Sequence, residues 1–245
     1  MLVEVWSDVV CPWCYIGKRR FEEAQRRLAD DPDFDDDVEV VYRPYQLDPR
    51  AAPGTSMPVA EAYARKFGGP EAAARIIDQM TAVAAGEGLE FHLERARRAN
   101  TRDAHRLLGW ALEHGPAGAQ ADLKERLLRA YFVEGEDVGD PDVLVAAAVD
   151  AGLPEDGARR MLEGDTGVDE LNAALRFAAD NEITAVPTYV IDRRWSIPGA
   201  QDPDTFVQVI KRLAARASAS EPADQTTSAS EPADETTRAE RASRR

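Results

Sequence analysis

The chain has 245 residues, enough for one domain with an insertion and a sizeable core. Asp and Glu number 45 against 30 Lys and Arg, which gives a formal net charge of -15. A field of this sign repels nucleic acids and anionic membrane surfaces, so we expect neither as a partner.

The first quarter of the chain predicts two strands with a helix between them. Residues 2–6 are rich in β-branched and aromatic side chains, which is typical of a strand. From 12 to 28 the apolar residues recur at helical spacing. The acidic stretch 30–37 is expected to be a loop, 38–42 a second strand, and the proline-rich segment 43–58 irregular.

Residues 59 to about 181 are almost wholly helical by pattern. Proline at 141 and at 154 indicates two helix starts, because the first helical position needs no amide donor. The predicted helices are 59–67, 73–85, 103–113, 121–133, 141–151, 154–162 and 168–181. After them we expect strands at 188–192 and 195–197 and a final amphipathic helix at 203–216.

This order of elements predicts an α/β fold in which a small mixed sheet is interrupted by a helical insertion. We expect 1–57 and 182–216 to form one discontinuous domain and 58–181 the insertion. The tail, 217–245, holds the near-copies SASEPADQTT and SASEPADETT and has few apolar side chains. Such a composition does not offset the cost of ordering the backbone, so we expect disorder there.

The only two cysteines form the motif Cys11-Pro12-Trp13-Cys14, directly after the first strand and at the head of the first helix. Positive charge at a helix N-terminus stabilises a thiolate on the first cysteine. Because the thiolate is the form that attacks a disulfide, the motif indicates thiol–disulfide exchange. Cys11 would be the attacking sulfur and Cys14 the resolving one.

Other interpretations of the motif fit less well. A zinc site needs about four ligands, and no second Cys-x-x-Cys or finger-like His pair exists. Haem attachment requires His after the second cysteine, where this chain has Tyr15. A structural disulfide across so short a loop would constrain the unfolded chain little. Inert buried thiols stay possible, although Pro and Trp between them make a poor core segment.

The opening residues also bear on the compartment. Residues 1–6 read as a core strand and lack the basic start and long apolar run of an export signal. No stretch approaches the roughly 18 apolar residues of a membrane-spanning helix. We therefore expect a cytoplasmic protein, in which a Cys-x-x-Cys is more often catalytic than structural.

Several separated motifs follow one another along the chain: SDVVCPWCYIG at 7–17, YRPYQL at 42–47, NTRDAHRL at 100–107 and VPT at 186–188. With these motifs the chain resembles the DsbA-like branch of the thioredoxin superfamily, and most closely the FrnE-like group of DsbA-family oxidoreductases, over about residues 1–215. Unlike some relatives, this chain has no second cysteine pair near its C-terminus.

The resemblance implies a thioredoxin fold with a cis peptide between Val186 and Pro187, next to Cys11. The freed backbone groups of Val186 would then bind an extended substrate segment by strand-like hydrogen bonds. Pro12 and Trp13, between the sulfurs, would tune the thiolate and the redox potential. Trp13 is either a platform for substrate or a half-buried part of the core. Asp8 precedes the motif and is a candidate acceptor for the Cys14 proton, or a residue that caps the loop.

The helical block and the second strand supply further candidates. His105 matches a feature of the family, but a lone His on an amphipathic helix more often has a packing role, and we favour that role. Tyr42, Arg43, Tyr45 and Gln46 follow the second strand and either line the cleft or pack at its rim.

The sequence thus favours a thiol–disulfide oxidoreductase or disulfide isomerase. We expect no prosthetic cofactor, protein or small-molecule disulfides as substrates, and a thioredoxin system or a small thiol as reductant or co-substrate. The alternative on the same fold is a 2-hydroxychromene-2-carboxylate isomerase or kappa-class glutathione transferase, which typically has Ser at the position of Cys11. A binding or chaperone module that does not use its thiols is a third possibility.

Overall fold

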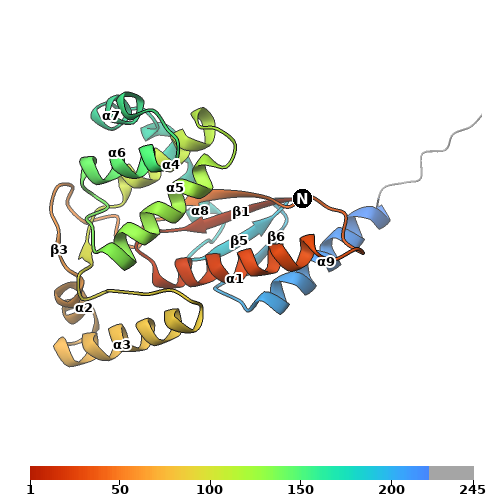
Figure 1. Cartoon of the computed structure of the whole chain (residues 1–245), viewed down its shortest axis with the longest axis horizontal. Coiled ribbons are helices and arrows are strands. Elements are labelled where there is room, and N and C mark those ends of the chain that lie inside the picture. Colours follow the sequence, from red (N-terminus) through yellow and green to blue (C-terminus); the bar gives the residue numbers. More distant parts are fainter. Residues whose placement is uncertain (221–245) are drawn as a thin grey trace, which may run out of the picture.

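A four-stranded mixed sheet lies at the centre of the molecule (Figure 1). The computed structural model describes residues 1–220 and side chains up to residue 217, so nearly all of the expected disordered tail lies outside the described part. The strands are β1 (Leu2–Ser7), β2 (Glu39–Pro44), β5 (Thr188–Ile191) and β6 (Trp195–Pro198), in the order β2-β1-β5-β6. β1 runs parallel to β2 and antiparallel to β5, and β6 runs antiparallel to β5.

Strand β1 is buried on both faces because helices cover both. Val3 and Val5 point into an apolar cluster with Phe21 of α1 (Pro12–Ala29) and Phe206 of α9 (Pro203–Ser220). On the opposite face the ring of Trp6 stacks on a phenylalanine of α8 (Val168–Asp180), with ring centroids 5.6 Å apart. This alternation follows from the two-residue period of a strand.

Helices α1 and α9 lie side by side across one face of the sheet (Figure 1). The insertion between β2 and β5 supplies the other helices, with α4 to α8 grouped together and α2 and α3 forming a separate pair. Its further elements are β3 (Met57–Pro58), α2 (Val59–Phe67), α3 (Pro70–Gly86), β4 (Arg97–Arg98), α4 (Arg102–His114), α5 (Ala119–Arg129), η1 (Ala130–Glu134), α6 (Pro141–Asp150) and α7 (Glu155–Glu163).

The predicted α/β class and the order of the major elements are confirmed, and the differences are local. β3 forms at the end of the segment 43–58 that we expect to be irregular, and it pairs with β4, which lies between the helices predicted at 73–85 and 103–113. The helix predicted over 121–133 ends in the π-helical turn η1. The last helix runs through Ser220 rather than ending at 216.

No helix within residues 1–220 is both long and apolar enough to cross a membrane.

Candidate active site

The two cysteines lie at the start of α1, directly after the loop that follows β1. Cys11 is the N-cap of the helix with extended backbone angles (φ -94, ψ 116), and Pro12 occupies the first turn. The Cys14 amide donates to the Cys11 carbonyl at 3.0 Å, which closes the first turn. Both thiols are free and buried, with 4% of Cys11 and 3% of Cys14 exposed. The site therefore holds two adjacent reduced sulfurs shielded from water.

The loop before β5 lies against the first sulfur. The peptide between Val186 and Pro187 is cis, as the family resemblance implied. Cys11 Sγ donates to the Val186 carbonyl oxygen at 3.8 Å, although 175 residues separate the two. Thr188 Oγ1 donates to the Ala185 carbonyl at 2.8 Å and ties the loop to its own start. The predicted neighbours Cys11, Val186 and Pro187 are thus brought together.

Gly17 lets this loop approach α1 closely. A Cβ at Gly17 would lie 2.7 Å from Tyr189 Oη and 3.0 Å from Pro187 Cγ, which is closer than real Cβ atoms come. A residue without a side chain is therefore required on the face of α1 that meets the cis-proline loop. Trp13, by contrast, projects outward and is 39% exposed, so its ring is available to a bound substrate.

Asp8 is fully buried, and hydrogen bonds from three donors organise its carboxylate. Oδ1 accepts from the Val9 amide at 2.8 Å and from His105 Nε2 at 3.1 Å, and Oδ2 accepts from the Leu47 amide at 2.8 Å. These bonds join the loop after β1 to the segment after β2 and to α4. The geometry therefore matches the loop-capping interpretation of Asp8.

His105 is buried on α4, and its Nε2 donates to Asp8, which lies three positions before Cys11. Beyond the packing role that the sequence favours, this histidine has a specific partner, Asp8, in the active-site loop. His105 thus joins the insertion to the site, across 97 residues of sequence.

Burial raises the pKa of the Cys14 thiol well above its ordinary value. The hydrogen bond and the electrostatic interaction with Cys11 add to this, whereas the positive charge of Lys124 and a backbone hydrogen bond from Asp8 act in the opposite direction. A buried thiol with this balance stays protonated at neutral pH unless a base or a cation helps it to ionise.

Lys124 of α5 supplies a buried amine that interacts electrostatically with this thiol. Only 1% of its surface is exposed, and Nζ has no hydrogen-bond partner among the residues that the structure describes. Burial lowers its pKa from 10.5 to about 8, because desolvation outweighs the attraction to Cys14, Asp8 and Cys11. Nζ also lies over the ring of Tyr42, 5.6 Å from its centroid.

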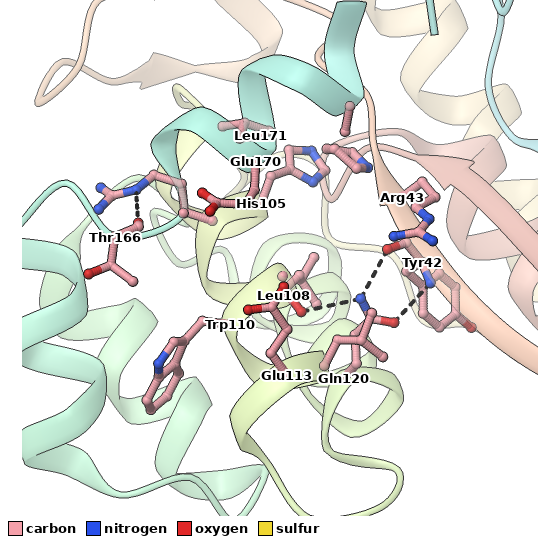
Figure 2. Close-up of a pocket in the computed structure, with 16 residues that line it drawn as sticks. Tyr42, Arg43, His105, Leu108, Trp110, Glu113, Gln120, Thr166, Glu170 and Leu171 are labelled. Carbon is pink, nitrogen blue, oxygen red and sulfur yellow. Dashed lines mark hydrogen bonds between the residues drawn. The ribbon is translucent and has the colours of Figure 1, made fainter. Parts of the chain in front are cut away.

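Two polar anchors fix α5 beside the site. Gln120 Oε1 accepts from the Tyr42 amide at 2.9 Å, and its Nε2 donates to the Tyr42 carbonyl at 3.0 Å, so the side chain pairs with the free edge of β2 (Figure 2). Glu125 accepts from Tyr15 Oη at 2.8 Å and forms ion pairs with Lys18 and Arg19 on α1. Lys124 lies between these anchors in sequence.

Two cavities flank the active-site loop. One, of about 140 Å³, lies between β2, α4 and α8 and is lined by His105, Tyr42 and Arg43 (Figure 2). The other, a cleft of about 510 Å³, is lined by Asp8 and Val10 and by α2, β3 and β4. The basic side chains of Arg50, Arg65, Lys66 and Arg98 line this cleft, in a chain that is acidic overall.

The four residues expected to line the cleft or pack at its rim, Tyr42, Arg43, Tyr45 and Gln46, lie in different surroundings. Tyr42 and Arg43 line the smaller cavity rather than the cleft beside Asp8 and Val10. Tyr45 Oη donates to the Thr184 carbonyl at 3.1 Å and so contacts the segment that leads to the cis proline. Gln46 Nε2 is buried without a hydrogen-bond partner within residues 1–220.

Sequence reasoning missed Lys124. One signal was present: it is one of only four lysines, and Leu127 and Leu128 follow it at the helical spacing of an apolar face. A lysine on such a face either extends its amine to solvent or is buried for a reason.

Comparison with known proteins identifies the family. The model of the DSBA-like thioredoxin domain matches residues 2–211. The chain belongs to this family. In agreement, the chain is 38% identical to the probable DsbA oxidoreductase SCO1869 from Streptomyces coelicolor, covering 88% of this chain and 90% of that one with a TM-score of 0.79.

Two further proteins are similar to the chain, one in sequence and one in fold. The Bacillus subtilis protein YwbO, described as uncharacterized, is 30% identical over 210 residues, covering 85% of this chain and 94% of its own length. A 2-hydroxychromene-2-carboxylate isomerase is only 13% identical but has the same fold, with a TM-score of 0.61 over 91% of this chain and all of that one. The fold alone therefore does not distinguish disulfide exchange from isomerase chemistry.

Proposed function

We propose that this protein is a thiol–disulfide oxidoreductase or disulfide isomerase in which Cys11 attacks and Cys14 resolves. The observation that carries the proposal is a pair of free thiols at the start of α1, with Cys11 Sγ against the Val186 carbonyl. A carbonyl at this position can pair with an extended substrate segment and orient its disulfide toward Cys11.

The reaction has two displacement steps. The Cys11 thiolate attacks one sulfur of the substrate disulfide, which forms a mixed disulfide and releases the other sulfur as a thiolate. Cys14 then loses its proton and attacks Cys11 Sγ, which forms the Cys11–Cys14 bond and releases the second substrate thiolate. The substrate gains two electrons and the cysteine pair loses two, so a thioredoxin system or a small thiol must return the pair to the dithiol.

The basic cleft supports an anionic substrate or co-substrate. Arg65 pairs with Glu61 and Arg98 with Asp48. Arg50 and Lys66 form no ion pair within residues 1–220, so their charges can attract carboxylates to the cleft. A small acidic thiol or an acidic peptide segment would satisfy both this charge and the chemistry of the cysteines.

We propose that the protein works in the cytoplasm, with no prosthetic group.

The alternative isomerase or transferase activity would bind a small thiol at the same loop and leave Cys14 without a role. Cysteine at position 11, where those enzymes typically have serine, together with the adjacent Cys14, favours disulfide exchange. In the third possibility, a binding module, a variant with both cysteines changed to alanine would keep its activity.

A redox titration with trapping of thiols tests the proposal. The protein is equilibrated in graded thiol–disulfide buffers, its free thiols are alkylated, and the products are weighed. We expect reversible loss of two thiols at one potential, no exchange in Cys11→Ser, and accumulated mixed disulfide in Cys14→Ser. Thiols that never pair, or exchange that persists in Cys11→Ser, would reject the assignment.

A further inference from the structure

Lys124 is a buried cation whose charge nothing in its surroundings neutralises by direct contact. Its Nζ has no hydrogen-bond partner within residues 1–220, whereas the other buried lysine, Lys18, bonds both Glu22 and Glu125. An ammonium group held away from water without a partner is costly. Such a group persists in a fold when the structure uses either its neutral amine or its charge.

Both thiols of the dithiol interact electrostatically with Lys124. Cys14, Asp8 and Cys11 favour its ammonium form, and Lys18 opposes it. From β2 the ring of Tyr42 lies beneath Nζ, and from α4 His105 is already bonded to Asp8. The carboxylate of Asp8 accepts from the Val9 and Leu47 amides and from His105, so it is held in the loop by three donors.

We propose that Lys124 takes the proton that Cys14 loses when Cys14 resolves the mixed disulfide. This inference rests on the proposed exchange reaction and adds a proton-accepting residue from the helical insertion. The lysine has four rotatable bonds, so Nζ can swing from the Tyr42 ring toward Cys14 while Gln120 and Glu125 hold its helix in place.

The physical advantage is that the total charge of the buried site does not change during the step. Before the transfer the site holds a neutral amine and a thiol, and after it an ammonium group and a thiolate. Both states hold the same number of protons, so no ion has to enter the site from water. Cys14 Sγ then attacks Cys11 Sγ, the bond from Cys11 to the substrate breaks, and the departing substrate thiolate takes its proton from the ammonium or from water. Electrons and protons balance without another reactant.

The two steps can be followed separately with the aromatic disulfide 5,5′-dithiobis(2-nitrobenzoate), which releases a coloured thiolate at each step. In Lys124→Met we expect the first release to be unchanged and the second to slow on the order of a hundredfold near pH 8, where a large share of Lys124 is the neutral amine that can accept a proton. Leu127→Met is the matched control, because it repacks the same helix face without removing a charge. Its second release should match that of the unaltered protein.

The pH dependence separates proton transfer from a merely structural effect. In the unaltered protein the second release should rise with pH and level off near the pKa of Lys124, about 8. In Lys124→Met it should keep rising, because Cys14 must then ionise unaided. The profile of the unaltered protein is informative even if the variant fails to fold.

Two outcomes would overturn the inference: an unchanged second release in Lys124→Met, or a second release in the unaltered protein that does not level off near this pKa. A protein that releases no second thiolate at all would instead refute the exchange reaction itself. Ionisation of Cys14 in a Cys11→Ala background gives an independent readout. There, Lys124→Met should raise the pH at which the thiolate appears.

Discussion

Replacing Lys124 by methionine should stabilise the folded protein, because it removes a buried ammonium group and keeps an apolar side chain of similar length. The lysine is 1% exposed, and burial lowers its pKa from 10.5 to about 8. This difference of about 2.5 units corresponds to about 3 kcal/mol of unfavourable free energy for holding the ammonium in the fold. The contact with the Tyr42 ring offsets about 1 kcal/mol, so we expect a net gain of about 2 kcal/mol.

The gain should depend on pH in a definite direction. Because the pKa is lower in the folded state, the unfolded chain binds more protons between about pH 8 and 10.5, and the unfolding free energy rises with pH across this interval. The free-energy cost of burying the ammonium is complete below the pKa that Lys124 has in the folded protein, and it is absent above the pKa that Lys124 has in the unfolded chain. The advantage of Lys124→Met should therefore be largest near neutral pH and shrink as the pH approaches 10.5.

Urea unfolding of both proteins at several pH values measures this difference directly. The m-values should agree, so that a shift in midpoint reports stability. In thermal unfolding the expected gain corresponds to a rise in Tm of about 4–8 °C at neutral pH. A variant less stable than the parent at neutral pH, or a difference that does not vary with pH, would refute the account of Lys124 as an uncompensated buried cation. A more stable but slower enzyme would show that the lysine is kept for activity.

Two further substitutions test the geometry around the site. Gly17→Ala places a methyl group against Tyr189 and Pro187, and should cost about 1–3 kcal/mol in urea unfolding and slow the first exchange step; unchanged stability and rate would contradict the close approach. His105→Ala removes a donor from buried Asp8 and leaves a cavity, and should cost about 2 kcal/mol. His105→Gln, which can keep the hydrogen bond, should recover part of that loss, and equal stability of the two variants would show that the bond contributes little.

Local sequence signals were sufficient for the framework of the fold. The β-branched run in β1 and the proline after Cys11 act through neighbours in the chain, so they specify a strand and a helix start without long-range information. The small strands β3 and β4 were missed because two residues carry no detectable period. The π-helical turn η1 was missed as well, because the helical pattern of the sequence continues through it without a break.

Within the site, the sequence by itself determined the dithiol and its place at a helix N-terminus, because both depend on residues that are adjacent in the chain. Only the tertiary structure decided which distant groups surround the sulfurs. His105 reaches Asp8 across 97 residues, and Gln120 reaches Tyr42 across 78. Lys124 is a candidate only because the fold packs α5 against β2 and bonds it to α1. The cost of a buried charge depends on what covers it, and that covering is assembled from segments far apart in the chain.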